Sequence, residues 1–112
     1  MEIKEIVKKI YNIIDEKKGE DIKVIDISGV STVADYFIIA SGNNVNQVQA
    51  ISEEIDEVLG REGITPKAIE GHRNATWVLL DYRDIVVHIF LKEDRSFYDL
   101  ERIWRDGKEI EM

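Results

Sequence analysis

Asp81 and His88 are the residues whose types and spacing first suggest chemistry. They occur in residues 77–91, where two apolar runs flank a short polar segment. If the two runs pair, both side chains lie on one face within reach of each other, and a carboxylate beside an imidazole can act as a general base. The sequence places no Ser or Cys nucleophile beside them. A partly buried His bonded to a carboxylate, without catalytic function, is therefore the favoured interpretation.

Three aspartates offer a second possibility, the binding of Mg²⁺. Asp81 and Asp84 flank a tight turn and Asp35 begins another apolar run, and nucleotidyl transfer requires two or three converging carboxylates. The turn spacing would hold Asp81 and Asp84 apart, no Gly-Ser phosphate loop precedes them, and turns attract Asp for conformational reasons alone. We predict no catalytic residue, no metal site and no cofactor, and keep a metal-dependent nucleotidyltransferase as the alternative function.

Residues 41–44, Ser-Gly-Asn-Asn, join an apolar run to an amphipathic one and could hold a phosphate at a helix N-terminus. The junction lacks the Lys and the second Gly of a P-loop, and it is not GxGxxG. An ordinary helix cap provided by Ser41, Asn43 or Asn44 is the favoured interpretation.

Residues 77–91 are predicted to form a β-hairpin, because both runs are rich in β-branched and aromatic residues and too short for a typical helix. A two-residue turn at residues 82–83 or 83–84 gives the same two faces. One face is apolar apart from one phenol and needs a core. The other mixes Trp, Asp and His with apolar residues and suits a surface that a partner covers. The first comprises Val78, Leu80, Tyr82, Ile85, Val87 and Ile89, and the second Trp77, Leu79, Asp81, Val86, His88 and Phe90.

The other elements are predicted from hydrophobic periodicity. We expect helices at residues 2–18, 45–59 and from 93 onward, with Phe97, Leu100 and Trp104 on one face of the last. Strands are expected at 22–28, 35–41 and 65–70; the second is nearly continuously apolar and therefore central, and the third can return parallel to it. Pro66 moves that third strand to an edge or to a late start. The order α-β-β-α-β-β-β-α predicts an α/β (α+β) domain with one mixed sheet of about five strands flanked by helices.

Length and composition limit the class of protein. The 112 residues suffice for a single domain, which we place at residues 1–106 with a polar, fraying tail at 107–112. The chain has no Cys, two His and a formal charge of -8, which disfavours a structural zinc site and direct nucleic-acid binding and favours a basic protein partner. No apolar run is long enough to span a membrane, and the N-terminus lacks a signal-peptide pattern, so we expect a cytoplasmic protein with no membrane partner.

Aromatic and acidic residues near the hairpin suggest an interface. Trp77 and Tyr98 are candidate anchors for a partner. Acidic residues would form a rim suited to Arg and Lys of the partner. That rim comprises Glu70, Asp81, Asp84 and Glu101.

Several strings resemble the ribosomal silencing factor family, also called Iojap-like proteins. They are DYFIIASGN at residues 35–43, QV at 47–48, EG at 70–71, WVLLDY at 77–82, DIVVHIF at 84–90 and RSFYDLE at 95–101 with Trp104. The resemblance covers about residues 1–106. It implies a fold related to nucleotidyltransferases without a working active site. It also implies binding to the large ribosomal subunit at its fourteenth protein, uL14, where the bound factor blocks joining of the small subunit and represses translation when nutrients are scarce.

The resemblance further implies a possible homodimer, and in organelle relatives a function in large-subunit assembly. Carried over to this chain, it implies that the residues matching the family's strand motifs contact the ribosomal protein. Among these residues, Tyr82 is the one that the hairpin alternation places on the core face, and it could reach a partner only if the end of the strand twisted outward. Arg83 stands where the family usually has Gly, in a turn that often needs a positive φ. The predicted contacts are Trp77, Leu79, Asp81, Tyr82, Asp84, His88, Tyr98 and Glu70.

Overall fold

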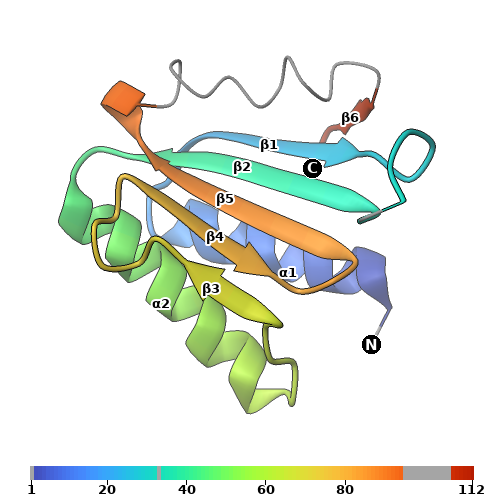
Figure 1. The fold of residues 1–112 in the computed structure, drawn as a ribbon, viewed down its shortest axis with the longest axis horizontal. Coiled ribbons are helices and arrows are strands. Elements are labelled where there is room, and N and C mark those ends of the chain that lie inside the picture. The colour runs from blue at the N-terminus through green and yellow to red at the C-terminus, as the bar shows by residue number, and fades with distance from the viewer. Residues whose placement is uncertain (1, 33, 95–106) are drawn as a thin grey trace.

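The computed structural model describes residues 2–32, 34–94 and 107–112. Within these residues one mixed sheet carries two helices on one face (Figure 1). The predicted mixed fold class is confirmed. In chain order the elements are α1 (Ile3–Glu16), β1 (Glu20–Asp26), β2 (Tyr36–Gly42), α2 (Val45–Arg61), β3 (Ala68–Glu70), β4 (Trp77–Asp81), β5 (Ile85–Leu91) and β6 (Lys108–Ile110).

The centre of the sheet is the parallel pair β2 and β5. The strand order is β3-β4-β5-β2-β1-β6, and every other neighbouring pair is antiparallel. All residues of β2 are buried, and β5 is buried at every residue before Leu91. A strand covered on both faces has no polar side, which explains the nearly continuous apolar runs of both strands. The predicted central position of residues 35–41 is confirmed.

Strand β3 lies at the edge of the sheet and begins at Ala68, as Pro66 predicts. It runs in the same direction as β2, because two antiparallel pairings and one parallel pairing separate them. It does not lie beside β2, as a simple crossover would place it. The hairpin β4–β5 is inserted between them, since the apolar β5 is suited to burial on both faces and the short β3 is not.

Residues 108–110 correct the prediction of a fraying tail. They form β6, which pairs antiparallel with β1 and gives the described residues six strands instead of about five. Ile110 packs against the core, and Lys23 of β1 forms an ion pair with Glu109 at 3.5 Å. A three-residue strand with one apolar side chain is too short to show a period-2 pattern, so local periodicity could not predict it. The predicted final helix, including Phe97, Leu100 and Trp104, lies outside the described residues beyond Asp94.

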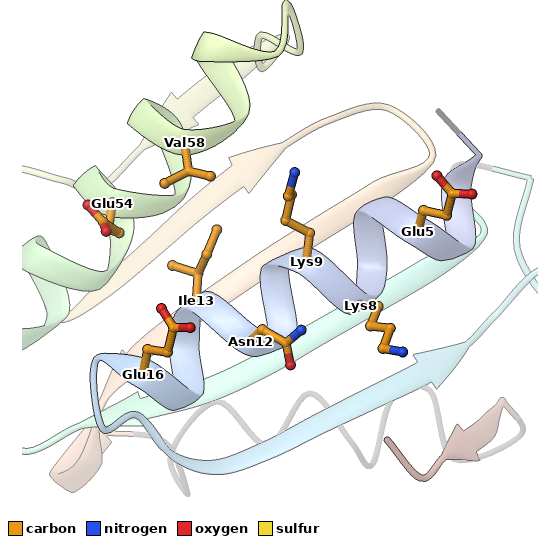
Figure 2. Close-up of a pocket in the computed structure, with 8 residues that line it drawn as sticks. All are labelled: Glu5, Lys8, Lys9, Asn12, Ile13, Glu16, Glu54 and Val58. Carbon is orange, nitrogen blue, oxygen red and sulfur yellow. The ribbon is translucent and has the colours of Figure 1, made fainter.

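Helices α1 and α2 cover one face of the sheet with the apolar stripes that their spacing predicts. Their buried residues include Val7, Ile10 and Ile14 of α1 and Ile51 and Ile55 of α2. A groove of about 430 Å³ runs between the helices, with Ile13 and Val58 on its walls and charged side chains around it (Figure 2). Lys9 of α1 forms an ion pair with Glu62 after α2. Within the described residues, the two helices therefore form one layer on one face of the sheet, and a second, smaller buried cluster lies on the other face.

The N-terminus of α2 is closed by side chains of its own first turn. The Asn44 Oδ1 accepts from the backbone N–H of Gln47 at 2.8 Å, and the Gln47 Oε1 accepts from the N–H of Asn43 at 2.6 Å. The amide of Gln47 also donates to the carbonyl oxygens of Lys17 and Lys18, at 3.1 and 3.0 Å. These groups fill the positions where a phosphate would bind, so the junction is a helix cap, as the sequence favoured.

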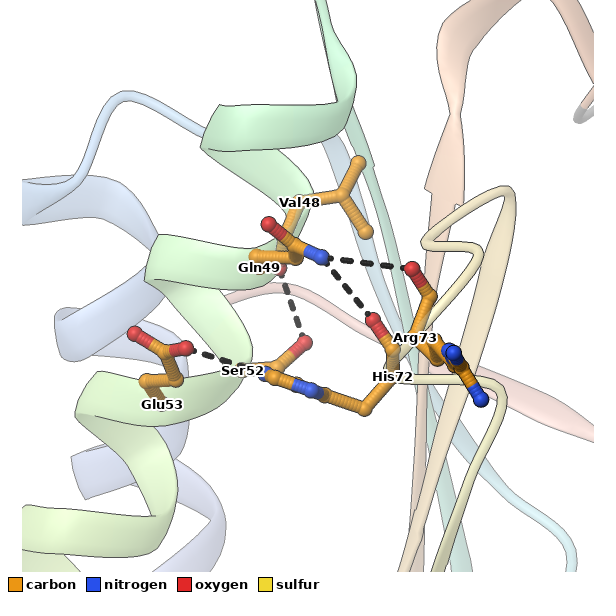
Figure 3. A network of polar contacts seen from close by, with 6 residues as sticks. All are labelled: Val48, Gln49, Ser52, Glu53, His72 and Arg73. Carbon is orange, nitrogen blue, oxygen red and sulfur yellow. Dashed lines mark hydrogen bonds and ion pairs between the residues drawn. The ribbon is translucent and has the colours of Figure 1, made fainter.

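The loop between β3 and β4 is fastened to α2 (Figure 3). The Gln49 amide donates to the carbonyl oxygens of His72 and Arg73, at 3.1 and 3.4 Å, and the His72 Nε2 lies 3.0 Å from the Glu53 carboxylate. Gly71 opens this loop with φ +78, and a Cβ there would clash with the carbonyl oxygen of Trp77. Both the clash and the left-handed backbone require glycine at this position. The loop thus sets where β4 begins.

Replacing Gly71 with Ala is expected to destabilise the fold by at least about 2 kcal/mol, because it adds a steric clash to a left-handed backbone. Gly63 is the matched control, since it has φ +80 but open space around it. Gly63→Ala is expected to cost only about 1 kcal/mol. Urea denaturation of the two variants measures the difference, and equal losses would contradict the assigned clash.

Candidate protein-binding face of the sheet

The hairpin has the two faces that the alternation predicts. Trp77 lies opposite Phe90, Leu79 opposite His88 and Asp81 opposite Val86. Glu70 of β3 lies opposite Leu79, and residues directly opposite each other in neighbouring strands share a face. We call this surface the hairpin face; it consists of Glu70, Trp77, Leu79, Asp81, Val86, His88 and Phe90. The predicted core residues of the other face, Val78, Leu80, Tyr82, Ile85, Val87 and Ile89, all belong to the helix-covered core.

The turn of the hairpin is a strained two-residue connection. The N–H of Tyr82 donates to the carbonyl oxygen of Ile85 at 2.8 Å, which leaves Arg83 and Asp84 as the turn residues. Arg83 has φ +74, the left-handed backbone that the predicted turn requires and that glycine adopts without strain. The Asp81 Oδ1 accepts from the Arg83 N–H at 2.8 Å. Asp81 therefore supports the turn, and Asp84 lies exposed at its tip.

Rings from three strands stack on the hairpin face. The Trp77 ring lies 5.2 Å from that of Phe90, centroid to centroid, at an interplanar angle of 23°. The His88 ring lies 4.8 Å from Phe37 of β2 and 5.9 Å from Trp77. Phe37, Val86, His88 and Phe90 are buried, whereas Trp77 is half-buried. The cluster therefore has a buried base on the central strands and reaches the surface on β4.

Sequence reasoning did not find Phe37 as a member of this cluster. The apolar run at residues 35–41 indicates a strand, but both of its faces are apolar. Only the register that sets Phe37 beside Val86 places its ring next to His88, and no local signal fixes the register of a parallel pair.

His88 is bonded to an indole and not to a carboxylate, so the predicted Asp81–His88 pair is wrong. The Trp77 Nε1 donates to the His88 Nδ1 at 3.0 Å, while Asp81 bonds the turn backbone. His88 is 3% exposed, and its Nε2 has no hydrogen-bond partner among residues 2–32, 34–94 and 107–112. Burial lowers its pKa to about 4, so the ring is neutral near pH 7. A partly buried position for His88, on a face that a partner covers, was expected. The burial of β5 on both faces explains why His88 is almost fully buried instead.

Tyr82 is also interior, on the helix-covered face. It is 9% exposed, and its hydroxyl has no hydrogen-bond partner among the described residues. Burial, and to a smaller extent the charge of Asp56, raises the pKa of the phenol. Tyr82 keeps to the strand alternation and does not twist outward, so it does not belong to the hairpin face.

The other predicted site residues are divided between the hairpin face, the turn and the part of the chain that is not described. Trp77, Leu79 and Asp81 are half-buried and Glu70 is exposed, all on the hairpin face. Asp84 lies at the turn, and its backbone carbonyl accepts from the N–H groups of Asp35 and Tyr36. Tyr98 and Glu101 lie outside the described residues. The structure thus brings together two apolar and two acidic side chains on the outer strands β3 and β4.

The family model for the ribosomal silencing factor during starvation matches residues 1–112. The chain belongs to the ribosomal silencing factor family. It is 40% identical over 112 residues to the ribosomal silencing factor of Halalkalibacterium halodurans, which covers 100% of this chain and 96% of that protein. It is 47% identical over 107 residues to that of Bacillus subtilis, covering 96% and 91%. The crystal structure of a Chromobacterium violaceum protein matches with a TM-score of 0.91 at 34% identity, covering 100% and 92%.

Two further features are absent from the described residues. No group of three or more His, Asp or Glu side chains in this part of the chain could hold a metal ion. None of the helices within the described ranges is long and apolar enough to cross a membrane.

The buried imidazole is expected to make stability depend on pH. In the unfolded chain His88 titrates near 6.5, and in the folded protein near 4. Its contribution is therefore complete above pH 6.5 and is lost as the pH falls toward 4, by about 2 kcal/mol between pH 7 and pH 5. Urea denaturation at these two pH values is expected to show this loss for the wild type and a loss smaller by that amount for His88→Phe. The two proteins differ only at residue 88, so the difference between their losses reports on this side chain, and identical losses would contradict a buried neutral His88.

Proposed function

We propose that this protein is a translational repressor that binds the large ribosomal subunit through protein uL14 and sterically blocks joining of the small subunit. Family membership supports a ribosome-related function, because the bacterial relatives are named ribosomal silencing factors. The observation that carries the assignment to a surface is the composition of the hairpin face. There Trp77 and Leu79 are half-buried, Glu70 lies directly opposite Leu79, and Asp81 follows Leu79 on the same face of β4. A large aromatic anchor with a charged rim is the usual composition of a protein-binding hot spot.

The charge of the chain fits a basic partner. The formal net charge is -8, and phosphate oxygens would be repelled by such a surface. The carboxylates of Glu70 and Asp81 are free to pair with Arg or Lys on a ribosomal protein, although Asp81 also accepts from its own turn. We therefore propose contact with uL14 and no direct contact with RNA, by a protein acting in the cytoplasm.

A steric mechanism requires no catalytic group, and the site geometry does not favour one. The α2 N-terminus is filled by Asn44 and Gln47, and the Asp81 Oδ1 accepts from the turn backbone. Within the described part of the chain, the His88 ring bonds the Trp77 indole and has no carboxylate partner. The nucleotidyltransferase alternative would need converging carboxylates and an open phosphate site, so we do not propose it.

Sedimentation with purified large subunits tests this proposal. The wild type is expected to sediment with large subunits and not with intact ribosomes, and its binding is expected to weaken as salt is raised. Trp77→Ala is expected to weaken binding by about 30-fold, the loss typical of a hot-spot anchor. Glu70→Lys and Asp81→Lys are expected to weaken it as well, because each reverses the charge of the rim.

Two matched variants control for unspecific effects. Ile69→Ala removes an exposed apolar side chain of β3 on the opposite face, and Asp15→Lys reverses an exposed charge on α1. Both are expected to bind like the wild type. Thermal denaturation separates lost binding from lost folding for Asp81→Lys. Wild-type affinity of Trp77→Ala, Glu70→Lys and Asp81→Lys alike would move the interface away from the hairpin face, and absence of wild-type binding to excess large subunits would overturn the proposed function.

A further inference from the structure

We propose that His88 is a positioning residue for partner binding: it is too buried to touch a partner, and it holds the indole of Trp77 in the orientation that the partner meets. This inference rests on the proposed function of Trp77 as an anchor. Its basis is the hydrogen bond from the Trp77 Nε1 to the His88 Nδ1, at 3.0 Å, together with the 3% exposure of His88.

Two contacts with described residues hold the indole of Trp77, one through its face and one through its edge. Its face stacks on Phe90, the residue directly opposite in β5, with centroids 5.2 Å apart. Stacking alone allows the ring to slide and to rotate in its plane, because the attraction between ring faces has a broad optimum. The hydrogen bond from its edge to His88, two residues before Phe90, prevents that rotation. His88 is itself fixed, since its ring packs 4.8 Å from Phe37.

The direction of this hydrogen bond determines which nitrogen of the His88 imidazole carries the proton. An indole N–H can only donate, so the His88 Nδ1 must be unprotonated and its proton must reside on Nε2. In the part of the chain that the structure describes, that Nε2 proton has no acceptor. A buried donor without a partner lowers stability, and a phenyl ring would fill the same position without this disadvantage. The property that the imidazole provides and phenyl lacks is an acceptor for the Trp77 N–H.

An anchor that is already in its bound orientation loses less conformational entropy on association. Trp77 is the half-buried aromatic residue of the hairpin face, so its orientation decides which ring edge a partner meets. Buried His88 thus contributes to affinity through Trp77 and not by contact of its own.

Three substitutions of His88 separate this function from a packing function. Asn places its Oδ1 as many bonds from Cβ as the imidazole Nδ1, so His88→Asn keeps an acceptor in reach of the indole. Gln moves its oxygen one bond farther, and Phe fills the space without any acceptor. We expect His88→Phe and His88→Gln to weaken binding to purified large subunits by roughly three- to tenfold, the size of one lost hydrogen bond, and His88→Asn to recover most of the affinity.

The proton NMR chemical shift of the Trp77 indole N–H distinguishes this function from simple packing, because it reports whether the N–H donates a hydrogen bond. The Trp77 resonance, assigned by its loss in Trp77→Phe, is expected to shift upfield in His88→Phe and to stay near its wild-type position in His88→Asn. The melting temperature of His88→Phe is expected to equal or exceed that of the wild type, because the unpartnered Nε2 proton is gone. If His88→Phe fails to fold, the comparison of Asn with Gln decides.

A double-mutant cycle tests whether His88 acts through Trp77. In a Trp77→Phe background there is no N–H to hold, so adding His88→Phe is expected to cause no further loss of affinity. A further loss of the same size, or equal affinity of the Asn, Gln and Phe variants in the wild-type background, would overturn the inference. Absence of wild-type binding to large subunits would instead overturn the proposed function. In that case the inference falls with it as a statement about binding, and the indole resonance still decides whether His88 holds the ring.

Discussion

The parallel pairing of β2 with β5 is the constraint on which the rest of the structure depends. It places Tyr36 beside Ile85 and Gly42 beside Leu91, and the strands between these ends are buried on both faces. Parallel strands require a long connection, and the segment between β2 and β5 contains α2, β3 and β4. Helices cover one face because their apolar stripes need a partner surface of this kind. The other face is built on the same buried strands, so it is a stiff base for the aromatic cluster.

Strand alternation allows one strand to serve two purposes. In β5, Val87 and Ile89 extend into the core beneath the helices, and His88 and Phe90 extend to the hairpin face. The two sets are separated only by the backbone, so the position of the Trp77 ring is set by core packing. The half-buried anchor on β4 thereby gains the rigidity of the central strands without being buried itself. A rigid aromatic anchor on a sheet is suited to binding that depends on shape and that requires no chemistry.

The parts of the fold that the sequence predicted are those governed by local periodicity. The division of the hairpin into two faces, the cap of α2 and the late edge strand after Pro66 each follow from the residues themselves. The errors concern relations between distant segments. Residue spacing could not show that β5 lies beside β2 or that Lys108–Ile110 pairs with β1. It also could not show that the His88 ring accepts a hydrogen bond from the Trp77 indole and makes none with the Asp81 carboxylate. Asp81 was nearer to the backbone N–H of its own turn, and such local bonds compete effectively with a more distant imidazole.

In the proposed function, the hairpin face binds the large ribosomal subunit, and the bound protein occupies the space that the small subunit needs for joining. Light scattering of subunit joining, with large subunits preincubated with increasing amounts of this protein, tests that claim most directly. The account predicts that joining falls in proportion to the occupied fraction of large subunits and stops at saturation, with Trp77→Ala much less effective at the same concentration. Large subunits that carry the protein and still join small subunits at the normal rate would contradict it.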